Sequence, residues 1–484
     1  MQSRYEKEFC NYLVLGIILF ALIVGAAFWY ATLNGKTYTV ELREDGFYPK
    51  ELTIQKGDTV VFTTTREKPF WPASNVHPSH QIYPEFDPKT PIEPHSKWKF
   101  SFDKAGEWRY HDHLASQYTG LIIAGGKEKL PVQNAEECKK RENKWQCWED
   151  LLGAVLQAQG LNRALEIFSE LYTTEPDFAV NCHGFTHKLG EAAYFIFAEH
   201  KDIEVGPKTY YCGYGFYHGF MEALLQKTGN IEEARAFCTH VGKKLERETA
   251  FAEGACYHGI GHGAVDGGDP RAWGDPQAMI EPALNLCTHA GSTENQIYLC
   301  GTGVFNSLAV LFGDPKYKLH VDEENTYIVC EKQSNPLFKR ACYEQMNTLI
   351  VSVKNGDFKK VIQVMAGITD DEYARYAIES AAAHFATTVT AGDYEKMILL
   401  CRDAQPRLRS SCMHGFVGGV LEHGSPEEEY KKTLTLCRSK KFSEAERNNC
   451  FKSLFAYLNM QYPRIKVSNI CESEVEGQYK IHCQ

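Results

Sequence analysis

The stretch CTHVGKKLERETAFAEGACYHGIGHG, from Cys238 to Gly263, contains the unit that decides the larger part of the fold. Its first cysteine ends one segment of helical spacing and its second begins the next, with a polar loop between them. The same order returns in CTHAGSTENQIYLCGTG at residues 287–303. One such unit buries little apolar surface, whereas stacked copies build a continuous core. The recurrence therefore predicts an array of helices stapled by disulfides.

Glycine recurs three positions after the second cysteine of several units, as Gly215, Gly259, Gly303 and Gly415. A residue without a side chain lets a neighbouring helix approach closely, so we expect tight helix packing at this position.

The cysteine count also indicates disulfides. Of 17 cysteines, Cys10 lies near the N-terminus and the other 16 all follow residue 137. An even set in an exported chain is typical of a disulfide framework, and the absence of any CxxC pair argues against zinc ribbons. Near-neighbour spacing predicts the pairs Cys138–Cys147, Cys238–Cys256, Cys287–Cys300, Cys330–Cys342, Cys401–Cys412, Cys437–Cys450 and Cys471–Cys483. Cys182 and Cys212 remain as a wider eighth pair.

The N-terminus predicts the compartment. Tyr12 to Leu33 is a 22-residue segment without a charged residue, long enough to cross a hydrocarbon core of about 30 Å as a helix. We expect a cytoplasmic tail over residues 1–10, a single transmembrane anchor over 11–33, and the bulk of the chain outside the cytoplasm. A signal peptide cleaved after Ala27 is the alternative, and it exports the rest of the chain equally.

Two further domains are expected after the anchor. Residues 37–126 alternate as β-strands do, residues 127–137 form a linker, and residues 138–484 form the Cys-rich α-helical domain. The net charge of −10 argues against nucleic acid as a partner.

Three segments of the β-region carry a family resemblance: GFYPKELTIQKGDTVVFTTT (46–65), FWPASNVHPSHQIYPEFDP (70–88) and AGEWRYHDHLASQYTGLIIAGG (105–126). This region resembles the cupredoxin-like family, which implies an all-β Greek-key sandwich and copper. The expected fold class is therefore multidomain, with a transmembrane helix, this sandwich and then an all-α helical-repeat array.

The blue-copper ligands of that family are not matched. Counting back from Gly120 places Asp112 at the cysteine position, Ala115 at the second histidine and Tyr118 at the methionine. Without a thiolate, a blue-copper electron-transfer site cannot form.

A site made of histidines is expected in its place. His111 and His113 lie two apart on one strand and so point the same way, while His77 and His80 come from the Pro-rich loop that runs from Pro69 to Pro94. Four imidazoles suit copper, with zinc as the alternative. Asp112 and Glu85 are candidate outer-shell partners. The competing interpretation is that these histidines only fasten the loop by hydrogen bonds.

The helical region offers a second candidate metal site. Its histidines concentrate in successive units and form i,i+4 pairs, which is how a helix commonly presents two ligands. The members are His183, His187, His218, His258 and His262. No HExxH motif is present, so metalloprotease chemistry is not indicated. The competing interpretation is that histidines at repeat positions hydrogen-bond the disulfide loops or the next helix.

The sequence thus predicts a membrane-anchored extracytoplasmic protein with a copper-binding module and a helical interaction domain. One alternative is a metal-free structural protein whose solenoid binds a peptide, glycan or protein partner. Another is a copper oxidoreductase with a histidine-only site. Signatures of other enzymes, such as GxSxG, a P-loop or a Rossmann GxGxxG, do not occur.

Overall fold

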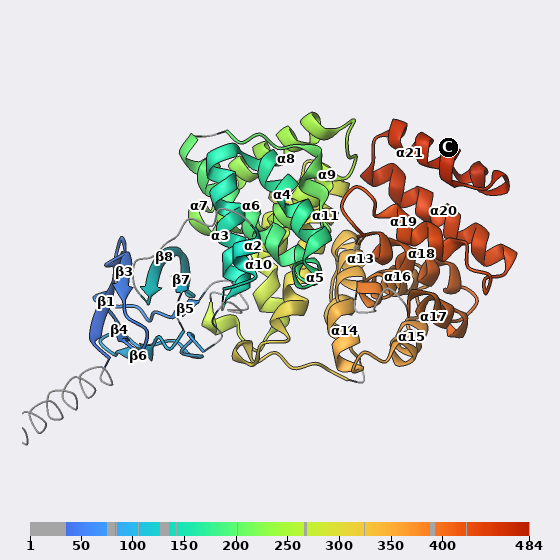
Figure 1. Cartoon of the computed structure of the whole chain (residues 1–484). Helices are drawn as coiled ribbons and strands as arrows, with labels where there is room; N and C mark the ends of the chain where they lie inside the picture. The colour runs from blue at the N-terminus through green and yellow to red at the C-terminus, as the bar shows by residue number, and fades with distance from the viewer. Residues whose placement is uncertain are drawn as a thin grey trace, which may run out of the picture. The chain divides into compact units, whose positions relative to one another are not determined.

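A computed structural model describes residues 35–74, 83, 85–104, 106–125, 135–141, 143–200, 202–265, 269–323, 325–387, 393–422 and 424–483 (Figure 1). The chain divides into two compact units, Met1–Leu130 and Pro131–Gln484. The expected tail at 1–10, the expected anchor at 11–33 and the histidines His77 and His80 lie outside the described residues.

The first unit contains, in its described residues, two small four-stranded sheets. Their strand orders are β2-β1-β4-β6 and β3-β8-β7-β5. The first sheet comprises β1 (Thr37–Arg43), β2 (Gly46–Tyr48), β4 (Thr59–Thr64) and β6 (Trp98–Ser101). The second comprises β3 (Glu51–Ile54), β5 (Pro72–Ser74), β7 (Gly106–Asp112) and β8 (Ala115–Ala124). Strands β1 and β4 pair in parallel, as do β3 and β8, and the remaining pairs are antiparallel.

This architecture corrects the expected fold class. The expected fold class was wrong in its β-region: in place of an all-β Greek-key sandwich, the described residues form two small mixed sheets, which are followed by a large helical region. Among the described helices, none has the length and apolar character needed to cross a membrane. The prediction missed the mixed sheets because the alternation of apolar and polar residues predicts strands but not which strands pair. Strand β3 joins the other sheet, so β4 returns beside β1 in the same direction.

Aromatic side chains fill the core of the first unit. Phe62, Phe86 and Tyr110 are fully buried, with ring centroids 5.3–5.5 Å apart. Gly120 faces Tyr110 across the β7–β8 ladder, and a Cβ there would lie 2.3 Å from the Tyr110 ring. The strand pair thus accommodates a large buried ring opposite a residue that has no side chain.

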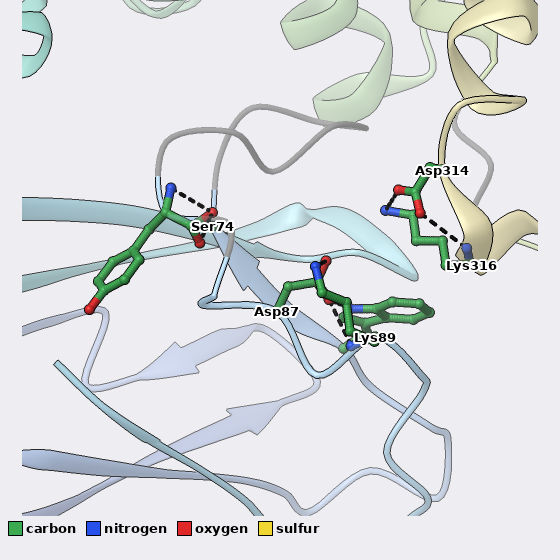
Figure 2. Close-up of polar contacts among 7 residues, drawn as sticks. Ser74, Asp87, Lys89, Asp314 and Lys316 are labelled. Atoms are coloured by element: carbon green, nitrogen blue, oxygen red, sulfur yellow. Dashed lines mark hydrogen bonds and ion pairs between the residues drawn. The ribbon is translucent and has the colours of Figure 1, made fainter. Parts of the chain in front are cut away.

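Hydrogen bonds fasten both ends of the Pro-rich loop. The Ser74 hydroxyl donates to the Tyr83 carbonyl at 3.0 Å, and the Tyr83 N–H donates to the Ser74 oxygen at 3.3 Å. Buried Asp87 accepts from the Trp71 indole N–H at 2.8 Å and pairs with Lys89 Nζ at 3.1 Å (Figure 2). These contacts hold Tyr83 and Asp87 of the loop against strand β5 and against Trp71, the residue that precedes it.

The second unit is helical and has an inner row of helices that pack in chain order. Consecutive members of the row contact one another. They are α6 (Cys182–His200), α7 (Gly215–Thr228), α9 (Ala252–Ala264), α11 (Glu294–Leu311), α13 (Pro336–Gln345), α16 (Asp371–Thr387), α18 (Arg409–Glu422) and α20 (Glu444–Gln461).

The other helices of this unit connect the inner row or pack against it. They are α2 (Ala135–Cys138), α3 (Lys144–Gln159), α4 (Leu161–Thr174), α5 (Pro176–Val180), α8 (Ile231–Leu245), α10 (Pro276–Ala290), α12 (Ile328–Glu331), α14 (Asn347–Val353), α15 (Phe358–Ala366), α17 (Tyr394–Ile398), α19 (Tyr430–Cys437) and α21 (Arg464–Glu474). Short 3₁₀ turns are η1 (Pro207–Tyr210), η2 (Pro270–Ala272), η3 (Pro315–Tyr317), η5 (Leu399–Asp403) and η6 (Gly477–Cys483).

Polar side chains set where these helices begin. Thr293 and Ser443 form complete capping boxes at α11 and α20, satisfying backbone N–H groups that the helix leaves free. Asp314 caps η3 with its side chain, which accepts from the Lys316 N–H at 3.1 Å and pairs with the Lys316 Nζ at 3.0 Å (Figure 2).

Eight disulfides link cysteines of the described helical unit, and each pair is one that the sequence analysis predicted. Cys238 of α8 is bonded to Cys256 of α9, which ties a flanking helix to its inner-row partner. The helix-rich region and its disulfides are therefore confirmed. On a chain-entropy estimate, closing loops of this length contributes about 3 kcal/mol per bond.

The inner helices approach one another backbone to backbone. A Cβ added to Gly303 of α11 would lie 1.9 Å from the carbonyl oxygen of His258, and one added to Gly261 of α9 would lie 1.9 Å from that of Cys300. Gly219 of α7 meets the His187 carbonyl of α6 at the same distance. No real side chain tolerates such a contact, so glycine is required here.

Segments that are far apart in the sequence of the helical unit touch. The Tyr211 hydroxyl, after η1, donates to Glu427 Oε1 at 2.9 Å across 216 positions of sequence. The Tyr210 and Tyr462 rings lie 5.9 Å apart, and the Tyr462 hydroxyl bonds the buried Glu429 carboxyl. Burial raises the pKa of Glu429 to about 7.

We predict that Gly415→Ala destabilises the helical unit. A Cβ at this α18 position would lie 1.8 Å from the Glu379 carbonyl oxygen, and overpacking of this kind costs about 3 kcal/mol. Gly153→Ala in α3 is the matched control, because no described atom outside the adjacent backbone of its own helix lies within 4 Å of its added Cβ. The control should gain about 0.5–1 kcal/mol from helix propensity. Urea unfolding followed by circular dichroism measures both, and equal stability of the two variants would contradict the close approach.

A second prediction concerns pH. Because the folded pKa of Glu429 is above its ordinary value of 4.5, the folded chain holds this proton more tightly than the unfolded chain does. Its stabilising contribution is full below about pH 4.5 and is lost as pH rises through about 7. Glu429→Gln should therefore reduce the fall in unfolding free energy between pH 5 and pH 8. The exposed Glu428→Gln is the control, and a variant that leaves the wild-type pH profile unchanged would refute the assignment.

Candidate metal centre

Three consecutive inner helices each present a pair of ligand-type side chains one turn apart. Residues at i and i+4 lie on one face of a helix, so each pair points in a common direction. The pairs are His183 and His187 on α6, His218 and Glu222 on α7, and His258 and His262 on α9. The close packing of α6, α7 and α9 brings these faces together.

Three histidines form the centre of this group. One ligand atom from each of His218, His258 and His262 lies within 4.8 Å of the others. The His218 ring centroid lies 4.4 Å from that of His262 and 4.9 Å from that of His258, and the His258 and His262 centroids are 5.0 Å apart. Side chains from α7 and α9 therefore converge on one point.

The histidines of α6 adjoin this group. The ring centroid of His218 lies 5.1 Å from that of His183 and 5.6 Å from that of His187. The His187 centroid also lies 6.4 Å from that of His262. All five histidines that the sequence analysis grouped are thus neighbours in the structure.

Hydrogen bonds fix the tautomers of two of these rings. His183 Nδ1 lies 2.7 Å from the Cys212 carbonyl oxygen, which can only accept, so Nδ1 carries the proton. His258 Nδ1 lies 2.7 Å from Thr302 Oγ1, whose own proton goes to the Leu299 carbonyl. In both rings the Nε2 lone pair is left for another partner, which is how outer partners commonly orient metal-binding histidines.

Glu222 lies between two of the rings. Its Oε1 is 3.5 Å from His262 Nδ1, and its Oε2 is 3.7 Å from His187 Nδ1. Ser307 Oγ on α11 lies 3.1 Å from the same His262 nitrogen. Burial raises the pKa of the Glu222 carboxyl.

Two imidazole nitrogens of the centre are buried without a hydrogen-bond partner among the described residues: His218 Nδ1 and His262 Nε2. His218 is only 7% exposed. A buried polar atom left unpaired costs about 1–3 kcal/mol, so each needs an explanation. Burial also lowers the pKa of His187, His218 and His258, which favours the neutral imidazole that binds metals. These donors therefore fit a metal ion.

Both sequence interpretations of these histidines have support in the contacts. His183 bonds the carbonyl of a disulfide cysteine and His258 bonds the next helix, as the structural interpretation expected. The unpaired nitrogens are what that interpretation does not explain. Sequence reasoning missed Glu222, although its signal was present, since it follows His218 by four positions in HGFME.

The expected copper site in the first unit lies partly outside the described residues. His111 and His113 are buried with ring centroids 5.7 Å apart, and His113 packs 5.0 Å from Trp71. His77 and His80 are not described. Within the described ranges, the His218 centre is where three or more metal-ligand side chains meet. The four-histidine copper site therefore stays a prediction.

The two candidate outer-shell acids of that site have other partners in the structure. Asp112 is fully buried and accepts from the Trp71 N–H at 2.7 Å, and it pairs with Arg66 at 3.4 Å. Burial raises its pKa to about 6. Glu85 is exposed and pairs with Lys104 at 3.0 Å. Asp112 thus fastens the start of the Pro-rich loop to β7.

Comparison with known proteins adds no family to these observations. No protein-family model matches the chain, and no curated protein matches it. The class that the described residues define is a disulfide-bonded helical domain with a buried histidine centre.

Proposed function

We propose that the helical unit binds a transition-metal ion through its buried histidines. The observation that carries this proposal is the pair of unpaired nitrogens on His218 and His262, inside a group of three histidines whose ligand atoms lie within 4.8 Å. Imidazole is a favoured ligand of both copper and zinc. Three histidines with a remaining open position are a common zinc set.

The rest of the unit supports a histidine-based site. All 16 cysteines that follow residue 137 are in disulfides, so thiolates are excluded as ligands in the helical unit. Blue-copper chemistry is excluded there for the same reason. The ion is held by imidazole nitrogens, with Glu222 beside them as a further oxygen donor or outer partner.

The same disulfides support an extracytoplasmic location for this unit. Bonds of this kind form and persist in oxidising compartments and are rare in the cytosol. A metal ion bound there is acquired outside the cytoplasm. The protein accordingly captures or retains copper or zinc at or beyond the cell surface.

The test is metal-dependent stability. Chain freed of metal with a chelator is titrated with Zn(II) and, separately, with Cu(II), while thermal unfolding is followed. A free ion concentration one hundred times Kd should add about 2.7 kcal/mol to the unfolding free energy.

His218→Phe keeps an aromatic ring and removes both nitrogens, so it should lower the affinity at least a hundredfold. His240→Ala is the matched control, because His240 is an exposed histidine of α8 outside the centre. A wild-type chain that neither ion stabilises, or a control that loses the effect equally, would overturn the proposal.

A further inference from the structure

Helix α11 packs against the histidine centre, although the three-histidine group contains none of its side chains. Its backbone meets that of α9 directly, since a Cβ added to Gly303 would lie 1.9 Å from the His258 carbonyl oxygen. Two buried hydroxyl side chains of α11 lie beside the rings of α9: Thr302 at His258 and Ser307 at His262. The contact between these helices therefore includes both α9 members of the centre.

We infer that Thr302 and Ser307 are positioning residues for the proposed metal ion, because they hold two histidines in the tautomer whose Nε2 lone pair binds it. The two histidines are His258 and His262. This inference rests on the proposed function, since it concerns the same ion. It adds α11, a helix without a ligand, to the elements that set the affinity for the ion.

The hydrogen bonds of Thr302 have a fixed direction. Its Oγ1 lies 2.5 Å from the Leu299 carbonyl oxygen, which only accepts, so the single hydroxyl proton is donated there. The same Oγ1 lies 2.7 Å from His258 Nδ1 and can therefore only accept from it. A neutral imidazole has one N–H, so Nδ1 carries the proton and Nε2 keeps the lone pair that a metal ion needs.

Ser307 favours the same tautomer in His262. Its Oγ lies 3.1 Å from Nδ1 of that ring, and Glu222 Oε1 lies 3.5 Å from the same nitrogen. The Nε2 atom of the ring is buried and has no hydrogen-bond partner among the described residues. A proton on Nε2 would therefore lack an acceptor, whereas a proton on Nδ1 faces a hydroxyl and a carboxylate. This arrangement leaves Nε2 for the ion.

Helix packing alone does not require hydroxyl groups at these two positions. Their neighbours Val304, Phe305 and Leu308 are buried apolar residues of the same helix. Thr302 and Ser307 instead each place an oxygen at a ring nitrogen of α9. Outer partners of metal-binding histidines typically contribute about 10–100-fold to metal affinity, so the two hydroxyls should have a measurable effect.

The zinc affinity of the full chain tests the role of Thr302. Thr302→Val keeps the shape of the side chain and removes the acceptor, so the His258 N–H loses its partner and the ring no longer has a fixed tautomer. The affinity for Zn(II), measured by competition with a chromophoric chelator, should fall about a hundredfold, the upper end of the range for outer partners. Thr302→Ser keeps the acceptor and should bind Zn(II) as tightly as the wild type does.

Ser307→Ala tests the second hydroxyl. It should lower the affinity about tenfold, the lower end of the same range, because Glu222 Oε1 remains beside His262 Nδ1. Thr433→Val is the matched control, since Thr433 is fully buried in α19 and its hydroxyl has no hydrogen-bond partner among the described residues. This control should bind Zn(II) as the wild type does.

The absorption spectrum of bound Co(II) separates positioning from a loss of stability. The visible bands of Co(II) depend on the geometry of its ligands, so Thr302→Val should change their shape at saturation and Thr302→Ser should not. A variant that is only less stable would give the wild-type spectrum once it is saturated, and that result would contradict the positioning role.

The outcomes distinguish this inference from the proposed function. A wild-type chain that binds no Zn(II) would overturn both. Wild-type affinity in Thr302→Val and Ser307→Ala, or an equal loss in Thr433→Val, would overturn the positioning role and leave the metal ion standing. Should Thr302→Val fail to fold, Ser307→Ala decides, and wild-type affinity in that variant would overturn the inference.

Discussion

Close backbone contact between consecutive inner helices is the constraint on which the helical unit and its histidine centre depend. Ordinary helix pairs stand about 8–10 Å apart, a spacing set by the side chains between them. Where Gly219 meets the His187 carbonyl and Gly303 meets the His258 carbonyl, those side chains are missing. The helix backbones therefore pack close together, and the imidazoles on their facing sides lie near one another. The glycines thus allow close helix packing, and this packing brings the histidines of the centre together.

The same contacts that stabilise the array also orient the donors. His183 fastens a disulfide loop through Nδ1, and His258 fastens α11 through Thr302. Each bond uses one ring nitrogen and fixes the other as a lone-pair donor. Structural and metal-binding roles therefore do not compete for these residues, since the two nitrogens of one ring can serve both. What distinguishes the centre from ordinary repeat packing is the pair of buried nitrogens that no described protein atom satisfies.

Sequence reasoning identified the local features of the fold and missed those that depend on distant partners. Cysteine spacing predicted seven of the bonds because each closes a short stretch of chain, and Cys182–Cys212, 30 positions apart, was the pair that remained. The i,i+4 histidines were visible as pairs on helices. The parallel pairing of β1 with β4 was missed, because alternation says nothing of which strands meet. The contact of Tyr211 with Glu427 has no local signal at all, since 216 positions separate the two. Glu222 was missed because acidic residues on helices are usually solvated.

One short loop links the contact of Tyr211 with Glu427 to the histidine centre. Tyr211 precedes Cys212, whose carbonyl fixes the ring of His183. The backbone of Cys212, Gly213 and Tyr214 takes left-handed angles, with φ of 52°, 69° and 60°, a conformation that costs L-residues about 1–2 kcal/mol each. Such a loop persists only where its surroundings hold it in place. The disulfide to Cys182 holds it on one side, and Glu427, 216 positions after Tyr211, holds it on the other. The contact between these distant segments is therefore part of what sets the orientation of His183, a histidine that adjoins the proposed metal centre.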